Sequence, residues 1–135
     1  MSGYLAYSYA RFTEYDPIGD RIPNAVESVA SVGVTYNSET GLYGGIRLRF
    51  FGPAPLIEDN SVRSASTTLV NLDAGYHFTH ALSLVVSTFN VLNRRDNDIT
   101  YYYESQLRGE AAPVADIHFH PVESRTVRAA VTMLF

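Results

Sequence analysis

Apolar residues alternate with polar ones along most of this chain, and this period limits the possible folds more than any other feature. Between residues 27 and 37, for example, Val32 and Val34 fall on one face while Ser31 and Thr35 fall on the other. A period of two is typical of a β-strand with one covered face. The pattern recurs in 3–12, 27–37, 42–51, 67–78, a segment that starts at 82, and 126–135. The sequence therefore predicts six strands and no helix.

The fifth of these segments has a clear beginning and an open end. Leu82, Leu84 and Val86 mark its apolar face. Beyond them the two faces are less distinct. The pattern allows the strand to stop before a polar stretch, or to continue past it to the tyrosines at 101–103.

The connections between the segments alternate between two lengths. Residues 38–41 (SETG) and 79–81 (THA) are short enough for hairpin turns. The other three are long and contain Pro and Gly, which interrupt regular structure; they are 13–26, 52–66 and about 104–124. This arrangement predicts an antiparallel up-and-down meander, with tight turns at one end and large loops at the other.

Charged side chains lie on the polar faces of these predicted strands: Arg47, Arg49, Asp73, His77 and Arg128. Charges are very costly inside a small closed core. They suit the watery interior of a transmembrane β-barrel, whose strands turn their apolar face to lipid. We therefore predict an open sheet that forms part of a larger transmembrane barrel, with these charges facing the lumen.

Aromatic residues gather near both ends of the predicted strands, as interfacial girdles require. Beside the short turns are Tyr36, Tyr76, Phe78 and Phe135, and beside the long loops are Phe12, Phe50 and Tyr101 to Tyr103. The alternative is a soluble antiparallel sheet with one face on a core. A six-stranded meander supplies no second layer for that core, and the loops are too polar to replace it.

The composition excludes several classes of function. With 10 basic and 14 acidic residues the net charge is -4, which argues against a nucleic-acid partner. The chain has no cysteine, so disulfides and thiolate sites are excluded. No run of apolar residues is long enough for a transmembrane helix, and residues 1–12 lack the pattern of a secretory signal peptide.

The whole chain, residues 1–135, resembles the C-terminal barrel segment of TonB-dependent outer-membrane receptors. Ile22-Pro23 is similar to the proline-led strand entry of that family, and Asn90-Val91-Leu92-Asn93-Arg94 is a degenerate match to its Asn-Leu-Phe-Asp-Arg-like motif. The final strand ends on an aromatic residue, as in the family. The stretches that carry the resemblance are 21–36, 41–53, 67–78, 89–103 and 126–135.

The resemblance implies an outer-membrane location and a parent function, which is energised uptake of a ligand such as an iron–siderophore complex. It implies membrane lipid and the barrel-assembly machinery as partners. That machinery reads the final strand as a sorting signal, here Val127, Ala129, Val131, Met133 and Phe135.

Family members also have a signal peptide, an energy-coupling box, an N-terminal plug domain and about 22 strands. This sequence matches only the last six strands, so we expect a fragment, or one piece of a split receptor, that is not competent alone. The remaining barrel and the plug, if separately encoded, would then be partners too.

Two groups of residues are candidates for ligand contact in the loops. His118 and His120 point the same way on an extended segment and, with Asp116, could meet one metal or iron chelate. Two or three ligands on one strand rarely make a closed site, so anchoring of the loop is the simpler role and we predict no metal site. Tyr101, Tyr102 and Tyr103 could stack on a flat ligand, or could simply stiffen the strand.

No catalytic motif is present, so we predict neither enzymatic activity nor a cofactor. The chain has no G-x-S-x-G elbow, and Gly44-Gly45 opens no helix. Arg47, Arg49 and Arg128 could contact an anionic ligand or a plug; solvation and ion pairing with Asp73 is the simpler role. The alternatives to a receptor segment are a soluble β-sheet binding module, a small lipid hydrolase, and a small oligomeric outer-membrane pore.

Overall fold

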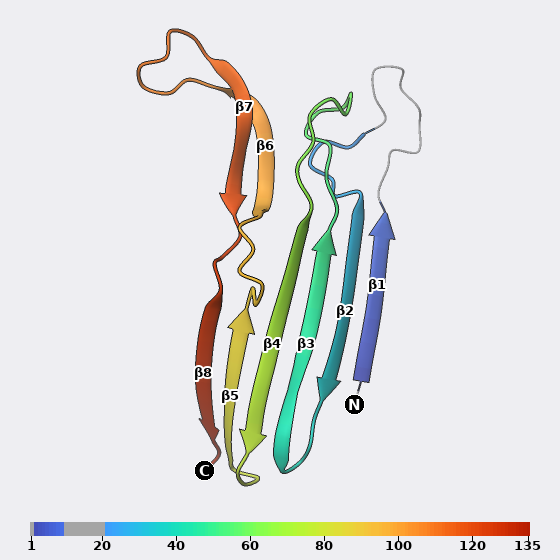
Figure 1. Ribbon diagram of the computed structural model, residues 1–135, viewed down its shortest axis with the longest axis vertical. Coiled ribbons are helices and arrows are strands. Elements are labelled where there is room, and N and C mark those ends of the chain that lie inside the picture. The colour runs from blue at the N-terminus through green and yellow to red at the C-terminus, as the bar shows by residue number, and fades with distance from the viewer. Residues whose placement is uncertain (1, 10–20) are drawn as a thin grey trace.

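The computed structural model describes residues 2–9 and 21–135, and within them every regular element is a β-strand (Figure 1). No helix in this part of the chain is long and apolar enough to cross a membrane. The strands are β1 (Ser2–Tyr9), β2 (Ser28–Tyr36), β3 (Gly41–Phe51), β4 (Thr67–His77), β5 (Leu82–Phe89), β6 (Asn97–Ser105), β7 (Val114–Pro121) and β8 (Thr126–Met133).

Six of these strands form one antiparallel sheet in the order β1-β2-β3-β4-β5-β8. The sheet is open, with β1 and β8 at its edges, and β6 and β7 pair with each other in a separate hairpin. The predicted all-β fold, an open antiparallel meander of six strands, is therefore confirmed. Figure 1 shows the short turns and the C-terminus at one end of the sheet, and the long connections at the other.

The structure corrects the predicted course of the chain after residue 89. The fifth segment is two strands, because β5 ends at Phe89 and β6 begins at Asn97. The predicted loop 104–124 is wrong in part, because β7 lies inside it. Gly109 and Pro113 interrupt only the tip of a hairpin, and the short alternation of 114–121 pairs with β6. Residues 10–12 of the first predicted strand, Phe12 among them, and 13–20 lie outside the described residues.

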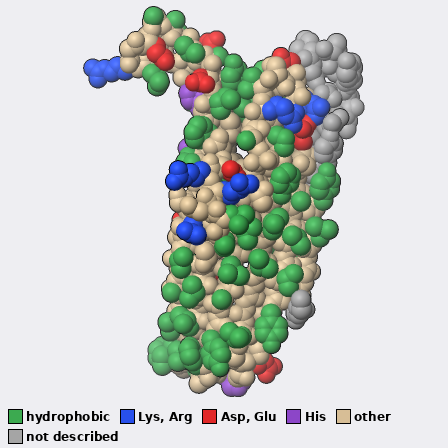
Figure 2. Space-filling model, viewed as in Figure 1, with side chains coloured by type: hydrophobic (Ala, Val, Ile, Leu, Met, Phe, Trp, Pro, Cys, Tyr) green, Lys and Arg blue, Asp and Glu red, His purple; other side chains and the backbone are tan. Residues whose placement is uncertain are grey.

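The strand register lines up apolar side chains in rows that cross the sheet. One row passes through Val34, Ile46, Leu72, Thr88 and Val127, which lie on β2, β3, β4, β5 and β8 in turn. Ile46 is 50% exposed and Val127 63% exposed. Figure 2 shows hydrophobic side chains spread over the lower part of this broad surface. An apolar face of this extent is thus open across the whole sheet, with no protein layer from the described residues on it.

The buried apolar residues lie in the connections at the long-loop end. Ala54 and Leu56 are 5% and 4% exposed, and Pro55 between them is less than 2% exposed. The amide of Asn24 donates to the carbonyl of Pro55 at 2.8 Å and fastens the two connections together. We call residues 21–27 and 52–66 the loop cluster.

An ionic contact also holds the loop cluster. The carboxylate of Glu27 pairs with Arg21 of its own connection and with Arg63 of the other. The Glu27 side chain is 14% exposed, so solvent screens these ion pairs less than it screens pairs on an open surface. The long-loop end of the sheet therefore carries its own small packed unit.

Tyrosine rings cover two glycines on the polar face of the sheet. Tyr4 lies opposite Gly33, and Tyr43 lies opposite Gly75. The Tyr43 ring also stacks on His77, with ring centroids 4.1 Å apart, and its hydroxyl donates to the carbonyl of Leu84 at 3.2 Å. An aromatic ring laid over a cross-strand glycine fixes the register of the two strands.

We expect Gly75→Ala to lower the free energy of unfolding by about 1–3 kcal/mol, the usual cost of overpacking. An added Cβ would clash with the ring of Tyr43, and the ring is held by His77 and Leu84. Urea unfolding of the full chain in detergent micelles measures the difference. In a Tyr43→Ala background the same substitution should cost close to nothing; an equal loss in both backgrounds would contradict the role of the ring.

Candidate ligand-binding site

The β6–β7 hairpin stands at the long-loop end, where it continues the line of β5 and β8 beyond the sheet (Figure 1). Two connections carry the chain across this junction: residues 90–96 lead from β5 to β6, and residues 122–125 lead from β7 to β8. Whatever fixes these two connections also fixes the direction of the hairpin.

Asn90 links the two connections. Its side-chain amide donates to the carbonyl of Arg94 and to the carbonyl of Glu123, each at 2.9 Å. Its side-chain oxygen accepts from the amide of Arg94 at 2.9 Å. Asn90 is 4% exposed, so these bonds form away from water. One side chain therefore holds both strands of the hairpin stem.

The same turn explains the motif Asn90-Val91-Leu92-Asn93-Arg94. Asn90 and Asn93 have φ of 49° and 50°, a left-handed conformation that asparagine tolerates better than most residues. The amide of Asn93 donates to the carbonyl of Asn90 at 2.8 Å and closes a tight turn. The side chain of Asn71 on β4 accepts from the amide of Asn90 at 3.1 Å. The motif thus ends β5, which pairs with β4 and β8, and leads into β6, which pairs with β7.

Four of the predicted ligand-side residues share one face of the hairpin. Tyr101 lies directly opposite His118, and His120 is two residues along β7 on the same face. The rings of Tyr103 and His118 are stacked with centroids 3.9 Å apart and an interplanar angle of 14°. Nε2 of His118 lies 3.2 Å from the hydroxyl of Ser105. The structure therefore brings Tyr101, Tyr103, His118 and His120 together.

An open cavity of about 470 Å³ lies against this face, lined by Tyr101, Tyr103, His118, Phe119 and His120. Its volume falls in the range of small-molecule sites, about 300–1,000 Å³. The flat tyrosine and histidine rings can stack on a planar aromatic ligand. The imidazole nitrogens can donate hydrogen bonds to oxygen atoms of that ligand. We call this cavity and its lining residues the hairpin site.

The structure separates two other predicted residues from the hairpin site. Tyr102 lies on the opposite face of the hairpin, paired with Ile117. Asp116 shares the face of His118, but its carboxylate accepts from the amide of Ile117 at 2.7 Å. Among residues 2–9 and 21–135 no group of three or more His, Asp or Glu side chains is placed to hold a metal ion.

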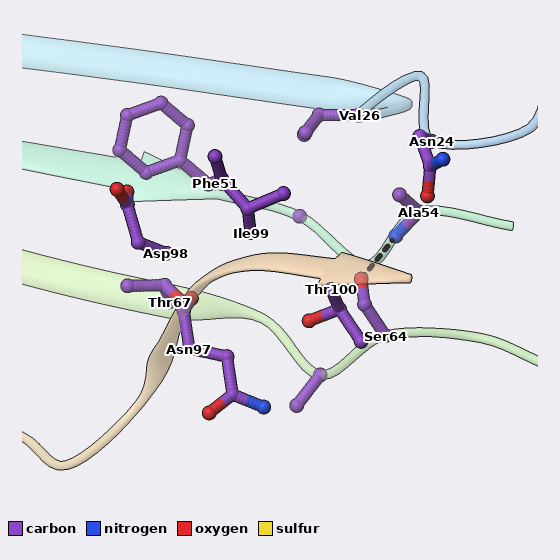
Figure 3. A pocket seen from close by; sticks show the side chains of 12 residues that line it. Asn24, Val26, Phe51, Ala54, Ser64, Thr67, Asn97, Asp98, Ile99 and Thr100 are labelled. Atoms are coloured by element: carbon purple, nitrogen blue, oxygen red, sulfur yellow. Dashed lines mark hydrogen bonds between the residues drawn. The ribbon is translucent and has the colours of Figure 1, made fainter. Parts of the chain in front are cut away.

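A second cavity, about 180 Å³, lies where the loop cluster meets the start of β6 (Figure 3). The hydroxyl of Ser64 accepts from the amide of Ala54 at 2.8 Å, and Thr67 donates to the carbonyl of Asn97 at the same distance. This cavity is below the usual size of a ligand site. It is a junction between the loop cluster and the hairpin, which sequence reasoning did not foresee because its lining comes from three distant segments.

The charged residues of the polar face lie beside both polar and apolar neighbours. Arg47 and Arg49 lie opposite Asn71 and Leu69 on β4. Asp73 accepts from the hydroxyl of Ser87 at 2.5 Å. Arg128 lies 3.7 Å from Glu123 and 4.8 Å from the ring centre of Phe89. Ion pairing of Arg47, Arg49 and Arg128 with Asp73 stays a prediction; the contacts described here join Asp73 to Ser87 and Arg128 to Glu123.

A hydrogen bond in the loop cluster changes the acidity of an exposed carboxyl. The amide of Ser61 donates to Asp59 at 3.0 Å. This bond favours the charged form of Asp59 and lowers the pKa of its carboxyl. The turn at residues 59–61 is therefore held best when Asp59 is ionised.

The predicted assembly signal lies on the apolar face. Val127, Ala129, Val131 and Met133 pair with Thr88, Val86, Leu84 and Leu82 of β5. Phe135 follows the end of β8 and is fully exposed, while the amide of Leu134 donates to the carbonyl of Ala81 at 2.8 Å. Recognition of this strand by the assembly machinery stays a prediction.

We expect Asn90→Asp to destabilise the hairpin by about 2–4 kcal/mol, because a carboxylate cannot donate and would face two carbonyls. Hydrogen exchange should speed up in β6 and β7 and stay unchanged in β2 and β3. Asn93→Asp is the matched control, since the side chain of Asn93 accepts from the amide of Arg125 at 3.2 Å and a carboxylate keeps that bond. Equal exchange in both variants would contradict a special role for Asn90.

Comparison with known proteins supports the fold. No family model matches the sequence. The structure is similar to the crystal structure of the ferric yersiniabactin uptake receptor FyuA from Yersinia pestis, with a TM-score of 0.57 and 21% identity. The match covers 85% of this chain and 17% of the FyuA chain. At this identity the likeness shows the fold. The chain therefore has the fold of a strand segment from a TonB-dependent receptor barrel, as the resemblance implied.

Proposed function

We propose that this chain is a wall segment of an outer-membrane receptor that takes up its ligand with TonB-supplied energy. The observation that carries the proposal is the apolar face, which spans all six strands of the sheet and is open to the surroundings. Hydrocarbon is the solvent that suits such a face. β3 and β4 have 11 residues each, enough to cross a bilayer when tilted by about 45°.

The polar face supports a wide, wet lumen. Arg47, Arg49 and Asp73 lie on it, together with the small residues Gly33, Gly45 and Ser87. Small and charged side chains leave room for water and for a mobile domain beside the wall. A plug that moves aside to open the lumen is what the family resemblance implies. The segment itself would carry no catalytic chemistry.

The hairpin site supplies the ligand contact in this proposal. An iron chelate with planar aromatic or carboxylate-bearing arms suits stacked rings beside two imidazoles. The uptake of a ferric chelate by FyuA, to which the fold is similar, supports the same ligand class. Binding would then occur at the long-loop end of the sheet, beyond the apolar face and next to the lumen.

Lysine substitutions at two adjacent alanines test the membrane part of the proposal. Ala129 lies on the apolar face and Ala130 on the polar face of β8. We expect Ala129→Lys to lower stability in lipid vesicles by about 2–4 kcal/mol, the cost of a lysine at the bilayer midplane, and Ala130→Lys to change it little. Urea unfolding in vesicles measures both. Equal tolerance at the two positions, with a soluble monomer in water, would favour the soluble binding module instead.

Tyrosine fluorescence tests the ligand part, because the chain has 10 Tyr and no Trp, and a bound ferric chelate quenches emission. The probes are ferric tris-catecholate and ferric trihydroxamate. We expect Tyr103→Ala and His118→Ala each to weaken binding of the preferred probe by about tenfold, or about 1.4 kcal/mol. Tyr102→Ala, on the opposite face, should bind as the parent does. No quenching by either probe would reject the ligand class and leave the membrane proposal standing.

A further inference from the structure

Three exposed arginines lie at the junction between the sheet and the hairpin. Arg94 and Arg95 are in the connection 90–96, and Arg125 is in the connection 122–125. We call them the arginine patch. None of them belongs to the hairpin site or to the polar face of the sheet, so the proposed function gives them no role.

The two connections hold the three arginines close together. The side-chain amide of Asn90 donates hydrogen bonds to the carbonyls of both Arg94 and Glu123. The side chain of Asn93, next to Arg94, accepts from the amide of Arg125 at 3.2 Å. The backbones at Arg94 and Arg125 are therefore held near each other, although the two residues lie 31 positions apart in the sequence.

The arginine patch begins where the apolar face ends. Val127 is the residue of that face nearest the start of β8, paired with Thr88. Arg125 lies two residues before Val127, directly before the first residue of β8. Figure 2 shows Lys and Arg side chains at the level of this junction, directly beyond the hydrophobic surface. By contrast Arg128, one residue after Val127, lies on the opposite face, where it covers the ring of Phe89.

Local carboxylates do not cancel this charge. Nε of Arg94 lies 3.8 Å from Asp96, whereas Glu123 pairs with Arg128 and accepts from the hydroxyl of Thr126 at 3.0 Å. The arginine patch thus keeps a positive balance on a chain whose net charge is -4. Its position, and not the composition of the chain, makes this surface basic.

We propose that the arginine patch binds the phosphate groups of anionic lipids at the ligand-side surface of the bilayer. A guanidinium presents paired donors that match two phosphate oxygens. The acyl chains of the same lipid would lie along the apolar face just below, so both halves of the molecule meet a matching surface. The inference rests on the proposed function, because it requires the apolar face to lie in the bilayer.

Native mass spectrometry of the full chain in detergent micelles tests this site. The probes are short-chain phosphatidic acid, the matching diacylglycerol without phosphate, and inorganic phosphate. We expect phosphatidic acid to bind and the combined variant Arg94→Gln/Arg95→Gln/Arg125→Gln to lose roughly a hundredfold in affinity, at about fivefold per arginine near a charged membrane surface. Arg108→Gln, at the hairpin tip, should bind as the parent does.

Three results would overturn the proposal: unchanged affinity in the combined variant, equal binding of diacylglycerol, or equally tight binding of inorganic phosphate. The last result would define a plain anion site and not a lipid site. If the combined variant fails to fold, Arg125→Gln alone replaces it with an expected loss of about fivefold, and no loss there rejects the proposal. Failure of the membrane proposal would appear separately, in the comparison of Ala129→Lys with Ala130→Lys.

Discussion

Everything in this structure depends on the pairing of backbone amides and carbonyls between neighbouring strands. In hydrocarbon no water replaces a missing partner, so a strand must be bonded on both sides or lie beside something that completes it. Strands β2 to β5 meet this condition within the sheet, whereas β1 and β8 each have one neighbour. The same pairing fixes the register, and the register decides that Ile46 faces one side and Arg47 the other. The separation of the apolar face from the polar face is thus a consequence of the backbone hydrogen bonds between strands.

The sheet and the long-loop end are stabilised by different interactions. The sheet is stabilised by the backbone hydrogen bonds between strands and by aromatic rings that lie over glycine, as Tyr43 lies over Gly75. The long-loop end is stabilised by a packed unit around Pro55 and by the side-chain hydrogen bonds of Asn90. The apolar face needs an external solvent to cover it, but the loop cluster does not. The hairpin site is therefore held in place by packing contacts and hydrogen bonds that lie within the chain.

The sequence was sufficient for the strands of the sheet because alternation is a local signal. It was insufficient for β7, whose eight residues follow Gly109 and Pro113 and end on Pro121, so that they could be read as loop. Nor did it show that β6 is a separate strand that begins after the turn at Asn90; once 101–103 lie on a strand, alternation alone puts Tyr102 on the face opposite Tyr101 and Tyr103. The pairing of Asp73 with Ser87, and of Arg128 with Glu123, depended on distances that only the folded register sets. Long-range partners were the part that pattern alone could not supply.

The turn at Asn90 has a consequence for how such a protein can change over time. One buried side chain joins the carbonyls on both sides of the hairpin stem, and all eight paired positions of β5 and β8 lie on the sheet side of it. The hairpin can therefore exchange its length and its surface residues without disturbing the wall below. A barrel wall built this way separates a part that must stay constant from a part whose sequence can vary.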